Sequence, residues 1–268
     1  DLTRFFRNPC RYLLRERLGI VLRVGDEELQ DDEPFVPDWP SRDALARRVL
    51  PRLLEGQPLA EVRICARAGI EYPAGRLGEL ELDQELQRLD YFARALAPLL
   101  AEPTLDPVGA TLEFALDGEP WRLIGSFGDL RKSGLVRYRY DETRANDYLN
   151  GWIGHLFRNA MERPEAAPRT TWHSRDGHYT LPYVDDARAR LAALLGLYRE
   201  GLRRPIHFFP KSAWLCAVDE GKLTRAAAKW HSWNAQYPGE DRDPAYHLAL
   251  RGVDGPLDAE FIACAATV

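Results

Sequence analysis

The acidic side chains between residues 79 and 130 are the ones that could support catalysis. Metal-dependent hydrolysis of a phosphodiester needs two or more carboxylates around a divalent cation, which binds the phosphate and activates a water molecule. A lysine commonly stabilises the charge that develops. The candidate ligands are Glu79, Glu81, Glu113, Asp117 and Asp129. Asp129 is the strongest candidate because it ends a predicted strand, whereas Asp117 belongs to a predicted turn.

The strand that follows Asp129 argues against a metal ion. It reads Arg137-Tyr138-Arg139-Tyr140, and two guanidiniums beside a cation site would repel the metal at short range. Alternation along a strand places Arg137 and Arg139 on one face, where their forked side chains could bind phosphate oxygens. A solvent-facing strand edge that discourages aggregation is the open alternative. The two tyrosines face the other way, where core packing is favoured over stacking on a base.

Charge is distributed unevenly along the chain. The net charge is −5, yet residues 1–23 and 121–139 are basic while residues 25–38 are strongly acidic. Basic patches on an acidic chain can bind phosphate backbones. The second basic region supplies our predicted DNA-binding set: Arg122, Arg131, Lys132, Arg137 and Arg139. Ordinary solvated helix and strand faces remain the alternative.

The histidines and cysteines offer little further chemistry. His173 and His178 flank a predicted turn at Asp176-Gly177 and could face each other across a hairpin, but a metal site would need a third ligand that the sequence does not indicate. We therefore expect exposed hairpin positions. The four cysteines form no CxxC pair, which favours buried thiols in a reducing cytoplasm. The sequence contains neither a GxxxxGK[ST] phosphate loop nor a GxSxG elbow.

The order of the predicted helices and strands that position these residues indicates an α+β, or mixed α/β, fold. Helical periodicity extends through residues 1–18, 41–54, 58–67 and 76–100, with a stripe of leucines and Phe92 on the last helix. Alternation then predicts three antiparallel strands with turns at Asp117-Gly118 and at residues 132–134. A helix over about 142–162, a hairpin around residue 176, a helix over 185–204, a strand at 205–210 and a helix near 224–235 follow.

Size and composition indicate a globular chain. With 268 residues, 45% hydrophobic and 29% charged, it can bury a substantial core. No apolar run approaches the roughly 20 residues of a membrane span, and no signal peptide is visible, so we expect a cytoplasmic protein without a membrane partner. The chain opens at Asp1 inside an amphipathic pattern, and its only methionine is Met161. We therefore expect a fragment of a longer polypeptide.

Several stretches resemble a known family. The opening LTRFFRNPCRYLLRERLGI, the later YREGLRRPIHFFPKSAW, and the strand meander followed by DYLNGWIGHLF resemble the C-terminal domain of exodeoxyribonuclease V gamma subunits. The resemblance covers essentially the whole chain in the same order. It implies a single domain over residues 1–268 with a PD-(D/E)XK nuclease-like core at about 75–165, a small mixed sheet flanked by helices with an extra hairpin and helices.

The resemblance also implies that the nuclease site is degenerate. Active nucleases of this fold carry Gly-x-x-Asp at the end of one strand and (Asp/Glu)-x-Lys on the next. Here Gly128 stands at the aspartate position, Arg137 at the acidic position and Arg139 at the lysine position. No histidine precedes His155, and the helix after the second strand has no glutamine. The expected catalytic set is therefore empty.

By resemblance, we expect a non-catalytic DNA-binding and scaffold domain of a helicase–nuclease complex that acts in double-strand break repair by recombination. Its partners would be DNA near the point of strand separation and the beta and alpha subunits. The domain would need no cofactor, since ATP and Mg²⁺ would be used by those subunits. Two alternatives stay open: an active nuclease using Asp129, and a pure protein-interaction domain. Aromatic candidates for contacts beyond the domain, with core packing favoured for each, are Phe5, Phe6, Trp39, Trp230 and Trp233.

Overall fold

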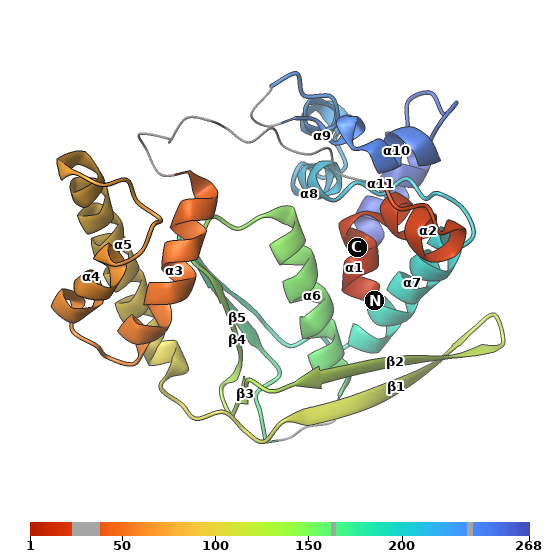
Figure 1. Cartoon of the computed structure of the whole chain (residues 1–268). Coiled ribbons are helices and arrows are strands. Elements are labelled where there is room, and N and C mark those ends of the chain that lie inside the picture. Colours follow the sequence, from red (N-terminus) through yellow and green to blue (C-terminus); the bar gives the residue numbers. More distant parts are fainter. Residues whose placement is uncertain (23–37, 162–164, 235–237) are drawn as a thin grey trace.

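The computed structural model describes residues 1–22, 38–161, 165–234 and 238–268 (Figure 1). Most of the acidic 25–38 stretch, predicted to be a loop, lies outside the described residues. The N-terminal half contains α1 (Leu2–Arg7), α2 (Pro9–Leu18), α3 (Trp39–Leu54), α4 (Leu59–Arg67), α5 (Arg76–Leu100), β1 (Val108–Leu116), β2 (Glu119–Phe127), β3 (Leu130–Arg131) and β4 (Gly134–Arg139). The mixed α and β content confirms the predicted fold class.

The second half alternates in the same way. It contains α6 (Ala145–Ala160), β5 (Thr170–Ser174), β6 (Gly177–Leu181), α7 (Ala187–Gly201), α8 (Pro210–Val218), α9 (Leu223–Trp230), a 3₁₀ turn (Glu240–Arg242), α10 (Pro244–Ala249) and α11 (Ala259–Thr267). Among the described residues, no helix is long and apolar enough to cross a membrane.

The central sheet has the strand order β3-β4-β5-β6. β4 and β5 run parallel, and α6 is the crossover that connects them. Parallel neighbours require such a crossover because the chain must return to the starting end of the sheet. β5 and β6 form the hairpin predicted around residue 176, with Ser174 opposite Gly177. β6 is therefore the outermost strand on its side of the sheet.

The prediction of one three-stranded meander is wrong. β1 and β2 form the predicted hairpin, with Asp117 and Gly118 at positive φ in its turn, but they make a separate two-stranded sheet. β4 pairs with β3 on one side and with β5 on the other, so no edge of β4 remains for β2. The N–H of Leu105, ahead of β1, instead bonds to the carbonyl of Leu130 in β3.

Two helical layers cover the central sheet (Figure 1). One apolar cluster joins α3, α4 and α5, and the predicted stripe on α5 faces it: Leu86, Leu89, Phe92 and Leu96 are buried. Val136 of β4 belongs to this cluster and Tyr140, just after β4, packs on it, while Leu135 belongs to the larger cluster that contains α6. The alternation of β4 thus separates the two layers.

The larger cluster gathers the N-terminal helices against α6, α7 and the C-terminal helices. Phe5 and Phe6 are fully buried and meet at 5.0 Å between ring centres, so they cannot contact partners beyond the domain. Trp230 is half-buried against Phe209. Of the five aromatic candidates, for each of which core packing is favoured, Trp39 and Trp233 are exposed.

Two further local predictions need correction. Residues 205–209 are not a strand: the N–H of His207 donates to the Glu260 carboxylate and that of Phe208 to the carbonyl of Ile206, so no ladder forms. Cys65 is only half-buried, whereas the other cysteines are buried. Burial raises the pKa of the Cys10 thiol to about 12.

Candidate functional site

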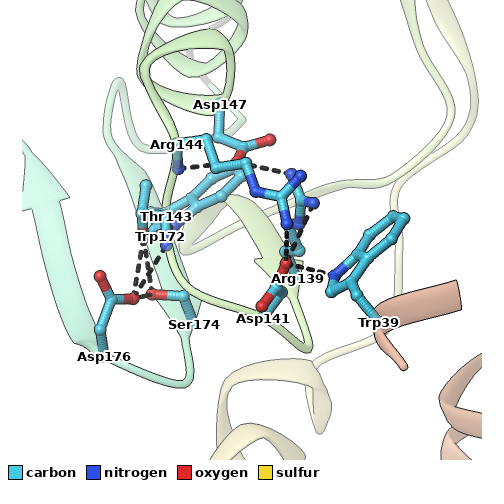
Figure 2. Close-up of polar contacts among 9 residues, drawn as sticks. All are labelled: Trp39, Arg139, Asp141, Thr143, Arg144, Asp147, Trp172, Ser174 and Asp176. Atoms are coloured by element: carbon cyan, nitrogen blue, oxygen red, sulfur yellow. Dashed lines mark hydrogen bonds and ion pairs between the residues drawn. The ribbon is translucent and has the colours of Figure 1, made fainter. Parts of the chain in front are cut away.

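The carboxyl ends of β4 and β5 meet beside the first turn of α6, and polar side chains gather there (Figure 2). Ligand sites in parallel sheets commonly form at this edge, because loops leave the sheet in opposite directions. β4 ends at Arg139, and the loop that follows carries Asp141, Thr143 and Arg144 before α6 begins. Of the residues that the sequence singles out, Arg139 lies at this edge.

Arginines and aspartates at this edge neutralise one another. Arg139 donates to Asp147 at 2.7 Å and to Asp141 at 3.3 Å. Arg144 donates to Asp141 at 2.6 Å, and its backbone N–H donates to Asp147 at 2.9 Å. Figure 2 shows both guanidiniums converging on Asp141. We call Trp39, Arg139, Asp141, Arg144 and Asp147 the arginine–aspartate cluster.

Trp39 ties α3 into the arginine–aspartate cluster. Its indole N–H donates to Asp141 at 2.7 Å, and its ring lies 4.8 Å from the guanidinium carbon of Arg144. Arg139 also lies 6.0 Å from the ring centre. Cations are attracted to the faces of aromatic rings at such distances. Although Trp39 is partly exposed, it makes its polar and aromatic contacts within the chain, between α3 and the loop after β4.

The environment favours the charged form of Asp141. Burial opposes its charge, but the backbone N–H of Glu142, the Trp39 indole and the two guanidiniums outweigh that effect and hold its pKa below the ordinary value. The carboxylate thus already has a positive partner on each side. A metal ion here would have to displace a guanidinium.

Asp129, the strongest candidate ligand in the sequence, forms an ion pair with Arg137. The sequence prediction that arginine lies beside Asp129 is confirmed, and the guanidinium occupies the place that a cation would need. Burial of Arg137 lowers its pKa from the ordinary value. Gly128 is exposed and has open space where a Cβ would project, so the surroundings would accommodate a larger side chain at this position.

The other candidate carboxylates do not join Asp129. Glu113 lies opposite Arg122 on the separate two-stranded sheet, and Asp117 in the hairpin turn pairs with Arg199. Glu79 pairs with Arg67. Across the described part of the chain, no three His, Cys, Asp or Glu side chains are placed to hold a metal ion.

The predicted DNA-binding set is divided among three places. Arg122 is exposed on β2. Arg131 donates to the carbonyl oxygens of Glu102 and Asp129 at 2.9 and 3.1 Å, and the adjacent Lys132 is exposed. Arg137 and Arg139 are engaged in ion pairs on β4. Only Arg122 and Lys132 of this set present an exposed charge.

A second polar chain continues from the arginine–aspartate cluster toward the β5–β6 turn. Trp172 donates to Thr143 at 3.1 Å, Thr143 to Ser174 at 2.8 Å, and Ser174 to Asp176 at 2.6 Å. Burial opposes the charge on Asp176, but these hydroxyl and backbone donors lower its pKa overall. The loop after β4 is thereby fixed to the loop after β5.

The comparisons with known proteins place the chain in a family. The family model described as the RecC C-terminal domain matches residues 1–220. The chain belongs to the RecC C-terminal domain family. The RecBCD enzyme subunit RecC of Escherichia coli (strain K12) is 26% identical over 268 residues, covering 93% of this chain and 23% of that protein. The RecC subunit of Buchnera aphidicola subsp. Acyrthosiphon pisum is 18% identical over 220 residues, covering 81% of this chain and 20% of that protein. The chain thus spans about a quarter or less of the length of these relatives.

The RecC family match includes the arginine–aspartate cluster and the β5–β6 hairpin and ends at residue 220, before α9. The hairpin has different chemistry on its two faces. Trp172 and Tyr179 face α6, where Tyr179 stacks on Tyr148 at 5.5 Å. His173 and His178 are register partners on the opposite face, 6.3 Å apart between ring centres.

The prediction of exposed histidines holds for only one of the pair. His178 is exposed, but His173 is half-buried against Phe92 of α5, with 4.7 Å between ring centres. Burial, with a smaller contribution from His178, lowers the pKa of His173. The ring of Phe92, from a helix far away in the sequence, covers His173. The local sequence of the hairpin therefore could not predict that His173 is half-buried.

Each face of the hairpin opens into a groove that sequence reasoning missed. On the α6 face an apolar groove of about 820 Å³ lies among α6, β6, α8 and α11, and Tyr148 stacks on Trp214 at 3.9 Å within it. On the α5 face a more polar groove of about 860 Å³ lies between α5 and the hairpin. A local signal for the first groove was present: Tyr148 and Trp152 are four residues apart in the predicted helix, so they share one helical face, and both are half-exposed.

Proposed function

We propose that this chain is a non-catalytic, DNA-contacting scaffold domain of an exodeoxyribonuclease V gamma subunit, acting in double-strand break repair by recombination. Its partners are DNA near the strand-separation point and the beta and alpha subunits. It uses no cofactor of its own, since ATP and Mg²⁺ serve those subunits. The family match supports the context. The observation that carries the non-catalytic assignment is the Asp129–Arg137 ion pair.

The proposal extends to the origin of the site. We take the sheet and its flanking α5 and α6 as a degenerate PD-(D/E)XK nuclease-like core, with Gly128, Arg137 and Arg139 at the positions of the catalytic residues. Guanidiniums supply permanently the positive charge that a nuclease takes from a metal ion. A carboxylate neutralised in this way has little affinity left for a second cation, because the two cations repel each other. In this proposal, the chain keeps the nuclease-like fold but lacks the metal-dependent cleavage activity.

A cleavage assay tests the non-catalytic part. The chain is incubated with end-labelled duplex and single-stranded DNA in the presence of Mg²⁺ or Mn²⁺, and products are resolved on a denaturing gel. We expect no metal-dependent products. Cleavage that disappears in Asp129→Ala but persists in the control Asp254→Ala, an exposed carboxylate away from the site, would establish the nuclease alternative instead.

The DNA-contacting part needs variants that leave the ion pairs intact. Reversing Arg137 or Arg139 would place like charges beside Asp129, Asp141 and Asp147 and disturb the fold. Arg122→Glu with Lys132→Glu changes only exposed positions. We expect weaker binding of labelled DNA and a log–log salt slope reduced by about 0.7–0.9 for each phosphate contact removed.

A pure protein-interaction domain is the second candidate function. The apolar groove favours it, because exposed aromatic and aliphatic linings of this size commonly mark contact sites. This candidate predicts that the chain has no salt-dependent affinity for DNA and that the Arg122/Lys132 variant behaves like the unmodified chain. Fluorescence anisotropy of a labelled oligonucleotide between 50 and 200 mM salt separates the two functions.

A further inference from the structure

The groove on the α5 face of the β5–β6 hairpin, which we call the hairpin groove, is built from two elements. The residues of α5 that line it recur at intervals of three and four, so they form one face of the helix. These are Gln84, Gln87, Arg88, Tyr91 and Ala95, with Phe92 at the base. From Gln84 to Ala95 this face extends about 16 Å along the helix. The opposite wall is the hairpin, from His173 to His178.

We propose that the hairpin groove binds a short segment of single-stranded DNA. Its lining combines the three kinds of group that such a ligand requires. Arg175 can contact a phosphate, while Arg88 adds an exposed guanidinium that is paired with Glu85. Tyr91, 78% exposed, presents a ring on which a base can stack. Gln84 and Gln87 supply amide donors and acceptors for base edges.

The exposed tyrosine favours a single strand over a duplex. Bases in a duplex are already stacked on one another, so an exposed ring gains contact only with an unpaired base. It also distinguishes DNA from an acidic peptide, which needs cations but neither a stacking ring nor base-edge amides. The histidine pair on the opposite wall adds flat, polar surface within the same groove.

Cations and carboxylates both face the groove, and the exposed guanidinium of Arg175 is the group that can meet a phosphate. Asp176 lines the groove as well and is held in its charged form, with one of its oxygens accepting from Ser174 and Thr143 of the polar chain described above. Glu85 lies beneath the surface, 1% exposed, where it accepts from Arg88 at 3.0 Å and from the Tyr140 hydroxyl at 2.9 Å. Arg175 is exposed at the rim, 5.8 Å from the Tyr140 ring centre.

This inference rests on the proposed contact with DNA but assigns it to a surface apart from Arg137 and Arg139. It also specifies single-stranded DNA as the ligand. The exposed charges of Arg122 and Lys132 alone would not distinguish a single strand from a duplex.

The test measures binding of a fluorescein-labelled oligo(dT) to the 268-residue chain by anisotropy at several salt concentrations. Tyr91→Ala should weaken binding about tenfold, the loss that removal of one stacking partner causes. Arg175→Gln should lower the log–log salt slope by about 0.7, the value for one phosphate contact on a single strand. Arg94→Gln is the matched control: it is an exposed arginine of α5 that pairs with Asp90 outside the groove.

Several results would overturn the assignment. Equal affinity of Tyr91→Ala and the unmodified chain, both shown to be folded by circular dichroism, excludes the groove. Preference for duplex over oligo(dT), or equal competition by an oligo-glutamate peptide, excludes the ligand class. The two levels of proposal fail separately: if the unmodified chain binds no DNA, the contact itself is wrong, whereas binding that is lost only in Arg122→Glu/Lys132→Glu contradicts the groove alone.

Discussion

The arginine–aspartate cluster and the hairpin groove are joined through the loops after β4 and β5, yet their polar groups behave differently. In the cluster, Arg139 is held by two carboxylates and retains 26% side-chain exposure. In the groove, Tyr91 and the neighbouring glutamines point to solvent. Residue type alone would have assigned binding to the arginine strand. The difference teaches that the pairing and exposure of a side chain decide what it can bind.

The largest expected effect is on stability, at the cluster. Asp141→Ala removes the common acceptor of Trp39, Arg139 and Arg144 and leaves charged donors without a partner. We expect the free energy of unfolding to fall by about 3 kcal/mol. Urea denaturation followed by circular dichroism measures it, with Asp254→Ala as a control that should change it by less than about 0.5 kcal/mol. A loss no larger than the control's would show that the cluster is not structural.

Acid should weaken the same cluster. The pKa of Asp141 is lower in the folded chain than the roughly 3.9 of an unfolded aspartate. Its stabilising contribution is therefore fully present above the unfolded value and is lost as the pH falls through the folded one. Denaturation between pH 6 and pH 2 should show a smaller dependence on pH in Asp141→Asn than in the unmodified chain. An unchanged pH profile would contradict the assigned ion pairs.

A smaller effect is expected at the Asp129–Arg137 pair. Both side chains are more than a third exposed, at 42% for Asp129 and 35% for Arg137. Solvent screens the attraction between such exposed charges. A double-mutant cycle with Asp129→Ala and Arg137→Met should give a coupling energy of about 0.5–1 kcal/mol. Zero coupling would contradict the ion pair as the basis of the proposed lack of metal binding at Asp129.

The smallest effect on stability is expected in the groove. Tyr91 is exposed, so Tyr91→Ala should change the free energy of unfolding by less than about 0.5 kcal/mol while it weakens oligo(dT) binding. The contrast with Asp141→Ala is the sharpest form of the comparison. A large destabilisation by Tyr91→Ala would mean that this ring has a packing role and that its binding result cannot be interpreted alone.

Local signals in the sequence were sufficient to predict several helices and turns. The Asp117-Gly118 turn, the leucine stripe of α5 and the helix that became α6 follow from turn chemistry and periodicity, and all three are confirmed. The position of arginine beside Asp129 also follows from the register of a short hairpin. These are interactions between residues close in the chain, where the number of possible arrangements is small.

Non-local contacts could not be predicted in the same way. The meander divides between two sheets because β4 pairs with β5, more than 30 residues later in the sequence. Trp39 reaches Asp141 across 102 positions, and no local pattern indicates that an aspartate in a loop will gather two arginines and an indole. The grooves likewise depend on how α5, α6 and α8 pack around the hairpin. The nuclease-like core at about 75–165 and the single-domain boundary stay predictions.

The position of a bound strand is the most direct test of the central claim that the groove, and not the arginine strand, contacts DNA. An oligonucleotide containing 5-bromouracil is crosslinked by ultraviolet light to the unmodified chain, and the modified peptides are identified by mass spectrometry. We predict crosslinks to Tyr91 and to the hairpin peptide that contains His173 and His178. Crosslinks confined to residues 122–139 would contradict the account.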